Sequence, residues 1–440
     1  MANIYIHDEF PPEASAMLQA LYSRSALSVQ AHVDKVKQQG SSKFMESYYV
    51  GYGHASIGDC GSTVLYIEGV SLLACKAIQD NPLYSGQECS TRYIDFSNQP
   101  VLDPLNTPAS QQIQQNWIDF YVQSKPRLVA SLKAKFPLPA GEKASVWEKA
   151  INARSFDILR GFLPAGSTSQ LSWATNFRQA YDKLSLLRHH PLTELREIAD
   201  RCLKLLKAKY PSSFSHKTYP EQEEYLRICA QSNNYFTCGE EHLPCEDFSY
   251  RTTIDNAELE AEELPLIRSR PQKTNLPRHL SQYGRFTCTF PLDFGSYRDL
   301  QRHRNGLCRI PLLNELLGFN AWYLEQLPND IRNEAVALLD KQLAAIRQLA
   351  ASSNAAAETM QYYYPLGTNI RCQLVYDLPE MVYVTELRSS NSVHPTLRRI
   401  AHQMHRALQI EHPQLKLHSD LSEDVFDTRR GLQDIAPKAE

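Results

Sequence analysis

The second half of this chain repeats the closing pattern of its first half at a nearly constant distance. Four landmarks recur in order: an apolar-Pro turn that leads to glycine and threonine, a Leu-Arg pair, a His-Pro pair and an Ile-Ala pair inside a helix. They begin at Leu163, Leu187, His190 and Ile198 in the first half and at Tyr364, Leu387, His394 and Ile400 in the second. The offsets are 201, 200, 204 and 202 residues. This recurrence indicates a tandem duplication.

The length and composition predict a soluble protein with two domains. The chain has 440 residues, of which 42% are apolar and 22% charged, and no apolar run is long enough to cross a bilayer. The ten cysteines are scattered, and no signal peptide is recognised at the start. We therefore expect free thiols and a cytoplasmic location. A net charge of −3 argues against a wide nucleic-acid surface, although local cationic pockets for small phosphorylated ligands stay open.

Hydrophobic periodicity predicts a mixed α/β organisation. Strands are expected at residues 4–6, 63–70 and 286–290, and helices at 12–38, 71–78, 109–136, 144–162, 297–304 and 330–362. An amphipathic helix closes each half. The polar stretch with acidic residues 258–263 predicts a link between the halves. The expected organisation is thus a domain at 1–212, a linker at 213–277 and a second domain at 278–440.

One candidate anion site is the segment Ser85–Tyr93 in the first half. If it is extended, alternation places Glu88, Ser90 and Arg92 on one face, where hydroxyl, backbone N–H and guanidinium can hold a phosphate. The alternative is a half-buried strand that carries a surface ion pair.

Two further segments have the chemistry of ligand sites. A glycine-rich turn at 51–58 carries His54 and Ser56 and lets a ligand approach the backbone, although Ser56 can equally cap a helix. In the second half, Arg302, His303 and Arg304 form a cationic triplet that can bind a pyrophosphate or a reduced flavin; the alternative is a solvated helix face.

Together these segments resemble the flavin-dependent thymidylate synthases, the ThyX family. The family signature is Arg-His-Arg, two residues, Ser, one residue, Asn-Glu or Gln-Glu, one residue, Ser, one residue, Arg-Tyr. The first half matches its later part, and the matching residues are Ser85, Gln87, Glu88, Ser90, Arg92 and Tyr93. Its triplet positions hold Asp80, Asn81 and Pro82 instead. The second half keeps the triplet at 302–304 and lacks the later part.

The resemblance implies two similar domains that form a pseudo-dimer, each a curved mixed sheet flanked by helices. Because the family assembles each active site where subunits meet, the loop of the first half would share one composite site with the triplet of the second. The mirror site, with Asp80 in place of an arginine, should be inactive. Each chain would then hold a single working site.

The resemblance also implies roles for individual residues. The expected catalytic residues are Arg188, Arg302 and His54. The expected FAD-binding residues are His54, Ser56, Asn176, Arg178, Arg302, His303 and Arg304. The expected substrate-binding residues are Gln87, Glu88, Ser90, Arg92, Arg160 and Arg188, with Arg160 also a candidate for the inactive site.

The implied activity is the reductive methylation of dUMP to dTMP. In the family, FAD carries the hydride, NADPH is the reductant and methylenetetrahydrofolate donates the one-carbon unit. Two alternatives stay open: modification of another pyrimidine nucleotide, and a non-catalytic protein that binds nucleotide or flavin. We expect two chains to associate in imitation of the family tetramer.

No metal site is expected from the sequence. Cys229, Cys238, Cys245 and His242 fall in the linker, but their spacing lacks the close pairs of structural zinc sites, so free thiols are the favoured interpretation.

Overall fold

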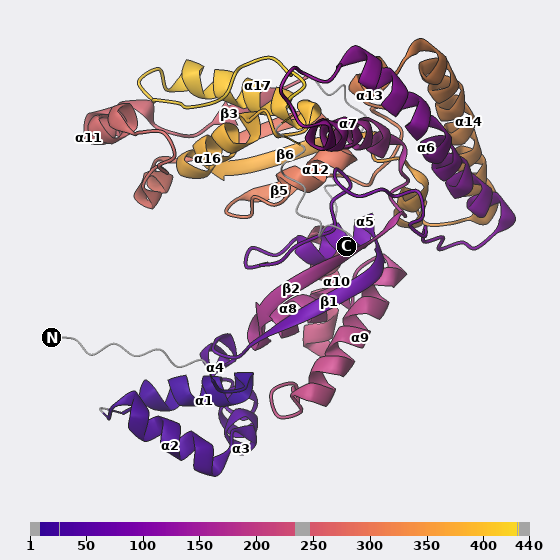
Figure 1. Cartoon of the computed structure of the whole chain (residues 1–440). Coiled ribbons are helices and arrows are strands. Elements are labelled where there is room, and N and C mark those ends of the chain that lie inside the picture. The colour runs from indigo at the N-terminus through magenta and orange to yellow at the C-terminus, as the bar shows by residue number, and fades with distance from the viewer. Residues whose placement is uncertain (1–8, 26, 234–246, 429, 431–440) are drawn as a thin grey trace. The chain divides into compact units, whose positions relative to one another are not determined.

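The computed structural model describes residues 9–25, 27–233, 247–428 and 430, and its contacts divide the chain into two compact units (Figure 1). The first unit comprises Met1–Val70, Ala77–Glu88 and Ser169–Asn234, and the second comprises Ser71–Lys76, Cys89–Thr168 and Tyr235–Glu440. The strand expected at residues 4–6 lies outside the described residues. Among the helices that the structure describes, none has the length and apolar character to cross a membrane.

The first unit begins with helices and ends with helices that follow a two-stranded sheet. Its elements are α1 (Pro12–Tyr22), α2 (Val29–Gln39), α3 (Ser42–Phe44), the π-helix η1 (Met45–Gly51), α4 (Ala55–Asp59), β1 (Ser62–Ser71), β2 (Thr168–Asn176), α8 (Phe177–Leu187), α9 (Thr193–Lys209) and α10 (Pro220–Asn233). Strands β1 and β2 pair, and the segment 85–88 bridges to β2 through Ser85 and Glu88.

The single helix expected over 12–38 is two helices. The backbone N–H of Ser23 closes α1 on carbonyl oxygens of the preceding turn, and α2 starts only after Ser28. The separation lets the two helices pack face to face, with Met17 and Leu18 against Val33 and Val36. Apolar periodicity could not reveal this break, because the same residues would form one stripe on a continuous helix.

The second unit combines a four-stranded sheet with long helices. Its strands are β3 (Ser249–Thr252), β4 (Arg285–Asp293), β5 (Leu307–Arg309) and β6 (Asn369–Asp377). Its longer helices are α6 (Pro108–Lys135), α7 (Ala144–Leu159), α11 (Asn256–Ser269), α14 (Asn329–Ser353), α16 (Leu378–Ser389) and α17 (Pro395–Glu411). The shorter helices are α12 (Phe294–Leu300), α13 (Ala321–Glu325), α15 (Ala357–Met360), η2 (Arg160–Phe162), η3 (Arg278–Tyr283) and η4 (Gln361–Tyr363), and α5 (Leu72–Gln79) runs from this unit into the first.

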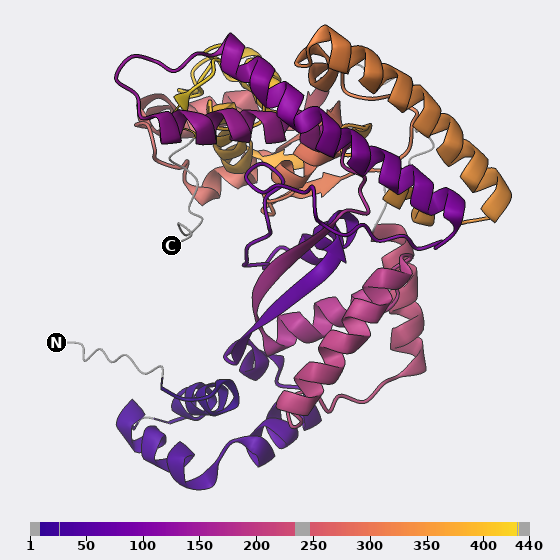
Figure 2. The ribbon, with the colours of Figure 1, turned by 45° about the vertical axis from the view of Figure 1, so that its right-hand side comes forward.

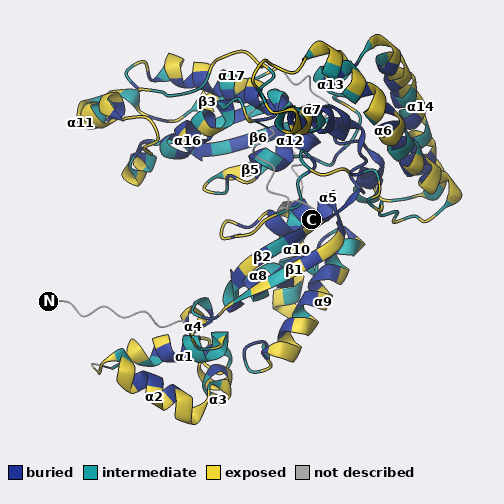
Figure 3. Cartoon of the chain, in the orientation of Figure 1, coloured by how far each residue is buried: buried dark blue, intermediate teal, exposed yellow. Residues whose placement is uncertain are grey.

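The strands of this sheet follow the order β3-β4-β6-β5, and every pair is antiparallel. The mixed strand direction expected for the sheet is therefore wrong here, because each pairing runs its strands in opposite senses. In the central strands β4 and β6, buried residues alternate with partly exposed ones (Figure 3). The segment 213–277 contains α10, β3 and α11, and β3 forms an edge of the sheet.

Helices α6 and α14 lie side by side in both ribbon views (Figures 1 and 2). The side-chain amide of Gln342 donates to the carbonyl oxygen of Ile113, and the indole of the fully buried Trp117 donates to that of Tyr363. The expected helix over 330–362 ends earlier, at Ser353, because Asn354 adopts a left-handed conformation (φ +50°).

The order of elements repeats along the chain. Strand, short helix, long helix, 3₁₀ turn, strand and two helices occur as β1, α5, α6, η2, β2, α8 and α9, and again as β4, α12, α14, η4, β6, α16 and α17. The additional helix α7 follows α6, and the shorter α15 follows α14. This repeated order supports the tandem duplication.

The two equivalent turns that precede β2 and β6 pair with each other inside the second unit. The amide N–H of Ala165 donates to the carbonyl oxygen of Tyr364 (2.9 Å), and that of Leu366 donates to Leu163 (2.8 Å). The 201-residue offset pairs Ala165 with Leu366 and Leu163 with Tyr364. The duplication therefore relates each of these two hydrogen bonds to the other. Such reciprocal contacts are typical of a two-fold interface between like surfaces and are the pattern expected of a pseudo-dimer.

Candidate functional site

The expected site residues are divided between the two units. The first unit contains His54, Ser56, Gln87, Glu88, Asn176, Arg178 and Arg188. The second contains Ser90, Arg92, Arg160, Arg302, His303 and Arg304. The second group therefore includes both the arginine of the first-half loop and the triplet of the second half.

In the first unit, two expected arginines bind carboxylates of neighbouring helices. Arg178 contacts Asp59 through Nε (2.7 Å) and Nη2 (2.5 Å), and Arg188 contacts Asp200 (3.0 Å) and Glu223 (3.6 Å). The side chain of Asn176 caps the N-terminus of α8. These ion pairs are partly exposed, so a ligand anion can compete for either guanidinium.

His54 stands at the end of a row of aromatic rings. Tyr48 and Tyr52 stack at 5.8 Å between ring centroids, and the imidazole of His54 follows at 6.3 Å from Tyr52. The turn before His54 depends on Gly53, whose φ of +71° favours glycine. Tyr52 is 75% exposed, and His54 and Ser56 are exposed too. This surface can stack against a flat ring.

Glu88 and Gln87 lie on the segment that bridges to β2. The amide of Gln79 donates to Glu88 Oε2 (2.8 Å), and the carbonyl oxygen of Gln87 accepts from the backbone of Ser172. The extended conformation expected for the whole motif ends soon after Glu88. Ser90 Oγ accepts the backbone N–H of Arg92 (3.2 Å), and the chain turns at this point. The alternation that would place Glu88, Ser90 and Arg92 on one face therefore does not continue to Arg92.

In the second unit, Arg92 is held by the buried carboxylate of Asp157 on α7. Its Nε and Nη2 donate to the two carboxylate oxygens (2.8 and 3.2 Å), and its Nη1 donates to the carbonyl oxygen of Ser392 (3.1 Å). Arg430 pairs with the same carboxylate. Asp157 has no exposed side-chain surface. Burial acts to raise its pKa, but Arg430 and Arg92 hold the pKa well below its ordinary value.

The cationic triplet does not lie in a helix. Asp293 accepts the backbone N–H of Ser296 and so starts α12, which ends at Leu300. The helix expected over 297–304 is therefore wrong in its second half, because the chain turns after Leu300 to reach β5. Arg302 is consequently free of helical constraint and is 46% exposed, whereas His303 is buried.

The first-half loop and the second-half triplet segment come together within the second unit. Arg298 Nη1 lies 3.3 Å from Thr91 Oγ1, although the two residues are 207 positions apart. Lys76 Nζ donates to the carbonyl oxygen of Arg298 (3.3 Å). The contact between Thr91 and Arg298 joins the turn at residues 90–92 to α12, the helix that precedes the triplet.

Three arginines, Arg160, Arg302 and Arg388, contact Asp299, and the charge of Arg92 also acts on its carboxyl group; we call these four residues the arginine cluster. Arg302 lies 3.4 Å and Arg160 3.7 Å from the carboxylate of Asp299, and Arg388 donates to its carbonyl oxygen (2.7 Å). Burial acts to raise the pKa of Asp299, but Arg302, Arg160, Arg92 and Arg388 together lower it below its ordinary value. Guanidiniums outnumber the carboxylates here, so the cluster has the charge to bind an anion.

Arg160, a candidate for either site, belongs to this cluster. Its guanidinium is 1% exposed, donates to Ser296 Oγ (2.9 Å) and approaches Asp299. It thus faces residues of the second half rather than the Asp80 segment of its own half. Among the described contacts, Asp80 provides its carbonyl oxygen to Lys183 (2.7 Å).

His303 is held neutral by its surroundings. Its Nε2 accepts the Nε–H of Arg388 (2.8 Å), and its Nδ1 faces Glu380 at 3.9 Å. Burial, followed by Arg388 and Arg302, lowers the pKa of His303 to about 3. Its role in the second unit is therefore to orient Arg388, and a positive charge on this imidazole is not available at neutral pH.

This neutral imidazole predicts a pH dependence of stability. The unfolded chain protonates His303 below a pKa of about 6.5, whereas the folded chain does so only near pH 3, so the free energy of unfolding should fall as pH drops through this window. Between pH 7 and pH 4.5 the wild type should lose about 2–3 kcal/mol of stability through His303, and His303→Gln, which keeps an acceptor for Arg388, should lack this loss. Urea unfolding at pH 7, 5.5 and 4.5 measures it. The exposed His279→Gln is the control, and equal slopes for wild type and His303→Gln would contradict the prediction.

Four residues of the cluster and its supports were not identified from the sequence: Arg388, Asp299, Asp157 and Arg430. Arg388 had a signal, since it is the second-half counterpart of Arg188 in the repeated Leu-Arg pair. The others had none, because single charged residues in helices or loops carry no spacing pattern.

Metal ligands do not gather in the part of the chain that the structure describes: no group of three or more His, Cys, Asp or Glu side chains is placed to hold an ion. Cys238, His242 and Cys245 lie outside the described residues. Cys229 is half-buried on α10.

Comparison with known proteins gives one family match. Residues 9–212 match the family described as thymidylate synthase complementing protein. A UPF0159 protein of Chlamydia muridarum is 27% identical over 431 residues, which cover 86% of this chain and 80% of that protein. UPF0159 proteins of Chlamydia pneumoniae and Thermoplasma acidophilum are 25% and 22% identical, and the alignments cover 82% and 86% of this chain. These alignments extend over both halves.

Proposed function

We propose that this chain is a flavin-dependent enzyme that methylates a uridine nucleotide, because residues 9–212 match the family described as thymidylate synthase complementing protein. The proposed reaction converts dUMP to dTMP, with methylenetetrahydrofolate as the one-carbon donor and NADPH as the reductant. One composite site per chain would perform it.

The observation that carries the proposal is the arginine cluster. Arg302 of the second-half triplet lies 3.4 Å from Asp299, Arg92 of the first-half loop helps to lower the pKa of the same carboxyl group, and the contact of Thr91 with Arg298 connects the two segments. A nucleotide monophosphate needs an excess of positive charge and several N–H donors, and guanidiniums provide both. A uridylate phosphate is therefore the ligand group that this site suits best.

The roles of individual residues follow from their environment. Arg302 is half exposed and its contact with Asp299 is long (3.4 Å), so it can turn to an entering phosphate. Arg92 is fixed by Asp157 and would present its remaining N–H groups in a set direction. Arg388 lies in the same cluster, and we propose it as a substrate-site residue alongside Arg188 from the resemblance.

FAD is the proposed cofactor, and the residues fit it in part. Bound FAD would supply the hydride chemistry of the reaction. In the first unit, His54 and Ser56 are exposed beside the aromatic row, and Arg178 offers positive charge for a diphosphate. In the second unit, Arg302 is accessible, but His303 is buried and committed to Arg388, so it fits a supporting role. Asn176, Arg178 and Arg304 stay proposed cofactor contacts.

Two measurements test the proposal. The absorbance spectrum of the purified protein should show bound flavin that bleaches on addition of NADPH. Tritium should be released from C5-labelled dUMP only when methylenetetrahydrofolate is present. Release from another labelled pyrimidine nucleotide, but not from dUMP, would move the proposal to that substrate.

One observation favours a second candidate, a non-catalytic nucleotide-binding protein. The guanidiniums of Arg92 and Arg160 already contact protein carboxylates. Such contacts are expected of arginines that stabilise the fold and take no part in a reaction. This candidate predicts dUMP binding without flavin uptake and without tritium release. Association of two chains is proposed in either case, and sedimentation measures it.

A further inference from the structure

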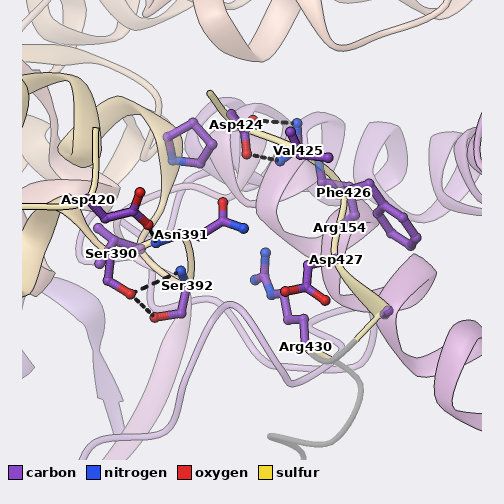
Figure 4. Close-up of a pocket in the computed structure, with 13 residues that line it drawn as sticks. Arg154, Ser390, Asn391, Ser392, Asp420, Asp424, Val425, Phe426, Asp427 and Arg430 are labelled. Atoms are coloured by element: carbon purple, nitrogen blue, oxygen red, sulfur yellow. Dashed lines mark hydrogen bonds and ion pairs between the residues drawn. The ribbon is translucent and has the colours of Figure 1, made fainter. Parts of the chain in front are cut away.

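A cavity of about 430 Å³ lies in the second unit beneath the end of the described chain (Figure 4). Ala150 and Arg154 of α7 form one side, residues 390–393 and Pro395 form another, and Asp420, residues 424–427 and Arg430 form the third. We call residues 412–428 and 430 the C-terminal strap. The volume falls within the range of small-molecule sites. None of the four residues of the arginine cluster lines this cavity.

The charges at this cavity are largely compensated by the protein itself. Arg154 pairs with Asp424 through both carboxylate oxygens (2.9 and 3.3 Å), and Arg430 pairs with Asp157. Asp420 accepts from Ser422 and lies 3.3 Å from Arg398. Among the described residues that line the cavity, both arginines are already paired with carboxylates, so they leave no unpaired cation to offset the repulsion between a phosphate and the strap carboxylates. The cavity therefore suits an uncharged ligand.

The remaining polar groups at this cavity suit a ligand that combines a ring with hydrogen-bonding edges and a sugar with free hydroxyls. Ser390 and Ser392 line the loop side with hydroxyls 3.2 Å apart, and Asn391 lies between them in sequence. Asn391 Oδ1 is buried without a hydrogen-bond partner among the described residues, which leaves an acceptor for an N–H donor.

The strap side provides the other two kinds of contact. Phe426 lines the cavity and is supported by Phe136, with ring centroids 4.6 Å apart and planes 13° apart. The carboxylates of Asp420 and Asp424 have lone pairs beyond those in use and can accept from sugar hydroxyls. An amide can hydrogen-bond to the edge of a base, and an aromatic ring can stack on its face. A carboxylate can accept hydrogen bonds from the hydroxyls of a sugar.

We propose that this cavity binds an uncharged nucleoside. Its occupant would contact two groups that hold Arg92 in place. The carbonyl oxygen of Ser392 accepts from Arg92, and Arg430 shares the Asp157 carboxylate with it. Nucleoside binding would thus bias the orientation of Arg92 at the arginine cluster. The inference goes beyond the proposed function, since binding requires neither flavin nor turnover.

Isothermal titration of thymidine and adenosine into the full chain, without flavin or folate, tests this inference. At least one of the two should bind with one site per chain. Ser392→Trp fills the cavity but keeps the backbone carbonyl that Arg92 uses, and it should weaken nucleoside binding by at least about tenfold. Arg302→Gln, a change in the arginine cluster, should leave nucleoside binding unchanged.

A second variant keeps the test decisive if Ser392→Trp does not fold by circular dichroism. Phe426→Leu removes the aromatic face and should weaken nucleoside binding in the same direction. In the Arg302→Gln protein, thymidine monophosphate should bind more weakly than thymidine, because the strap carboxylates repel its phosphate. No heat with either nucleoside, or affinities in the folded cavity variants equal to that of the wild type, would overturn the inference. Loss of dUMP turnover with nucleoside binding intact would count against the proposed function alone.

Discussion

Replacing Asp157 with asparagine should destabilise the second unit more than any other single change of similar size. The carboxylate is fully buried and is shared by Arg92 and Arg430, whose side chains are 12% and 14% exposed. Asparagine keeps the volume but leaves two largely buried guanidiniums without their counter-charge. Breaking one buried pair costs about 3–5 kcal/mol, so we expect a loss in this range at pH 7, measured by urea unfolding.

A surface ion pair provides the matched control for Asp157→Asn. Glu334 on α14 bridges to Arg127 on α6, but both side chains are 40% or more exposed. Glu334→Gln should therefore change the free energy of unfolding far less than Asp157→Asn. Asp157→Asn should also release Arg430 from its place, which limited proteolysis of the C-terminal strap can detect. A variant as stable as the wild type would show that Asp157 does not hold these arginines in solution.

Periodicity predicted much of the secondary structure because the buried faces of the elements are regular. The strands expected at 63–70 and 286–290 are β1 and β4, and the helix expected at 109–136 is α6. Breaks within helices were missed, as at Asn354, because one left-handed residue leaves the apolar pattern on both sides intact. The mixed α/β class was predicted correctly.

The candidate site was less accessible from the sequence, since its groups meet through long-range contacts. Thr91 and Arg298 are brought together by the fold, and no spacing rule links residues 207 positions apart. Only the resemblance to a family with shared active sites suggested that the two motifs cooperate. The carboxylates of Asp157 and Asp299 were missed for the same reason, because an isolated aspartate acquires its role from the arginines that the fold places around it.

Exposure also decides which residue of the triplet can bind a ligand, and the sequence does not reveal it. Neighbours in sequence have opposite environments: Arg302 is 46% exposed, whereas His303 is 7% exposed and holds Arg388. The turn after Leu300 produces this difference, and a helical triplet would have distributed its side chains differently. Because Arg302 is accessible, its substitution should have a large effect on nucleotide binding.

Arg302→Gln should weaken dUMP binding by about 10- to 150-fold and leave the free energy of unfolding nearly unchanged. A hydrogen bond to a charged group contributes about 1.5–3 kcal/mol, which corresponds to that range of dissociation constants. Stability should hold because the contact of Arg302 with Asp299 is long and half exposed. Calorimetric titration of dUMP at two salt concentrations measures both the affinity and its electrostatic part, and the salt dependence should decrease in the variant.

Asp80→Ala is the control for Arg302→Gln, because Asp80 occupies the corresponding triplet position of the first half. Its side chain is exposed, and its carbonyl contact with Lys183 survives the substitution, so dUMP affinity should stay within about twofold of the wild type. Arg302→Lys separates charge from geometry: it keeps the positive charge but not the two-pronged donor, and should recover only part of the affinity. If Asp80→Ala weakens dUMP binding and Arg302→Gln does not, then the nucleotide phosphate binds at the first-half triplet position, and the arginine cluster has a structural role.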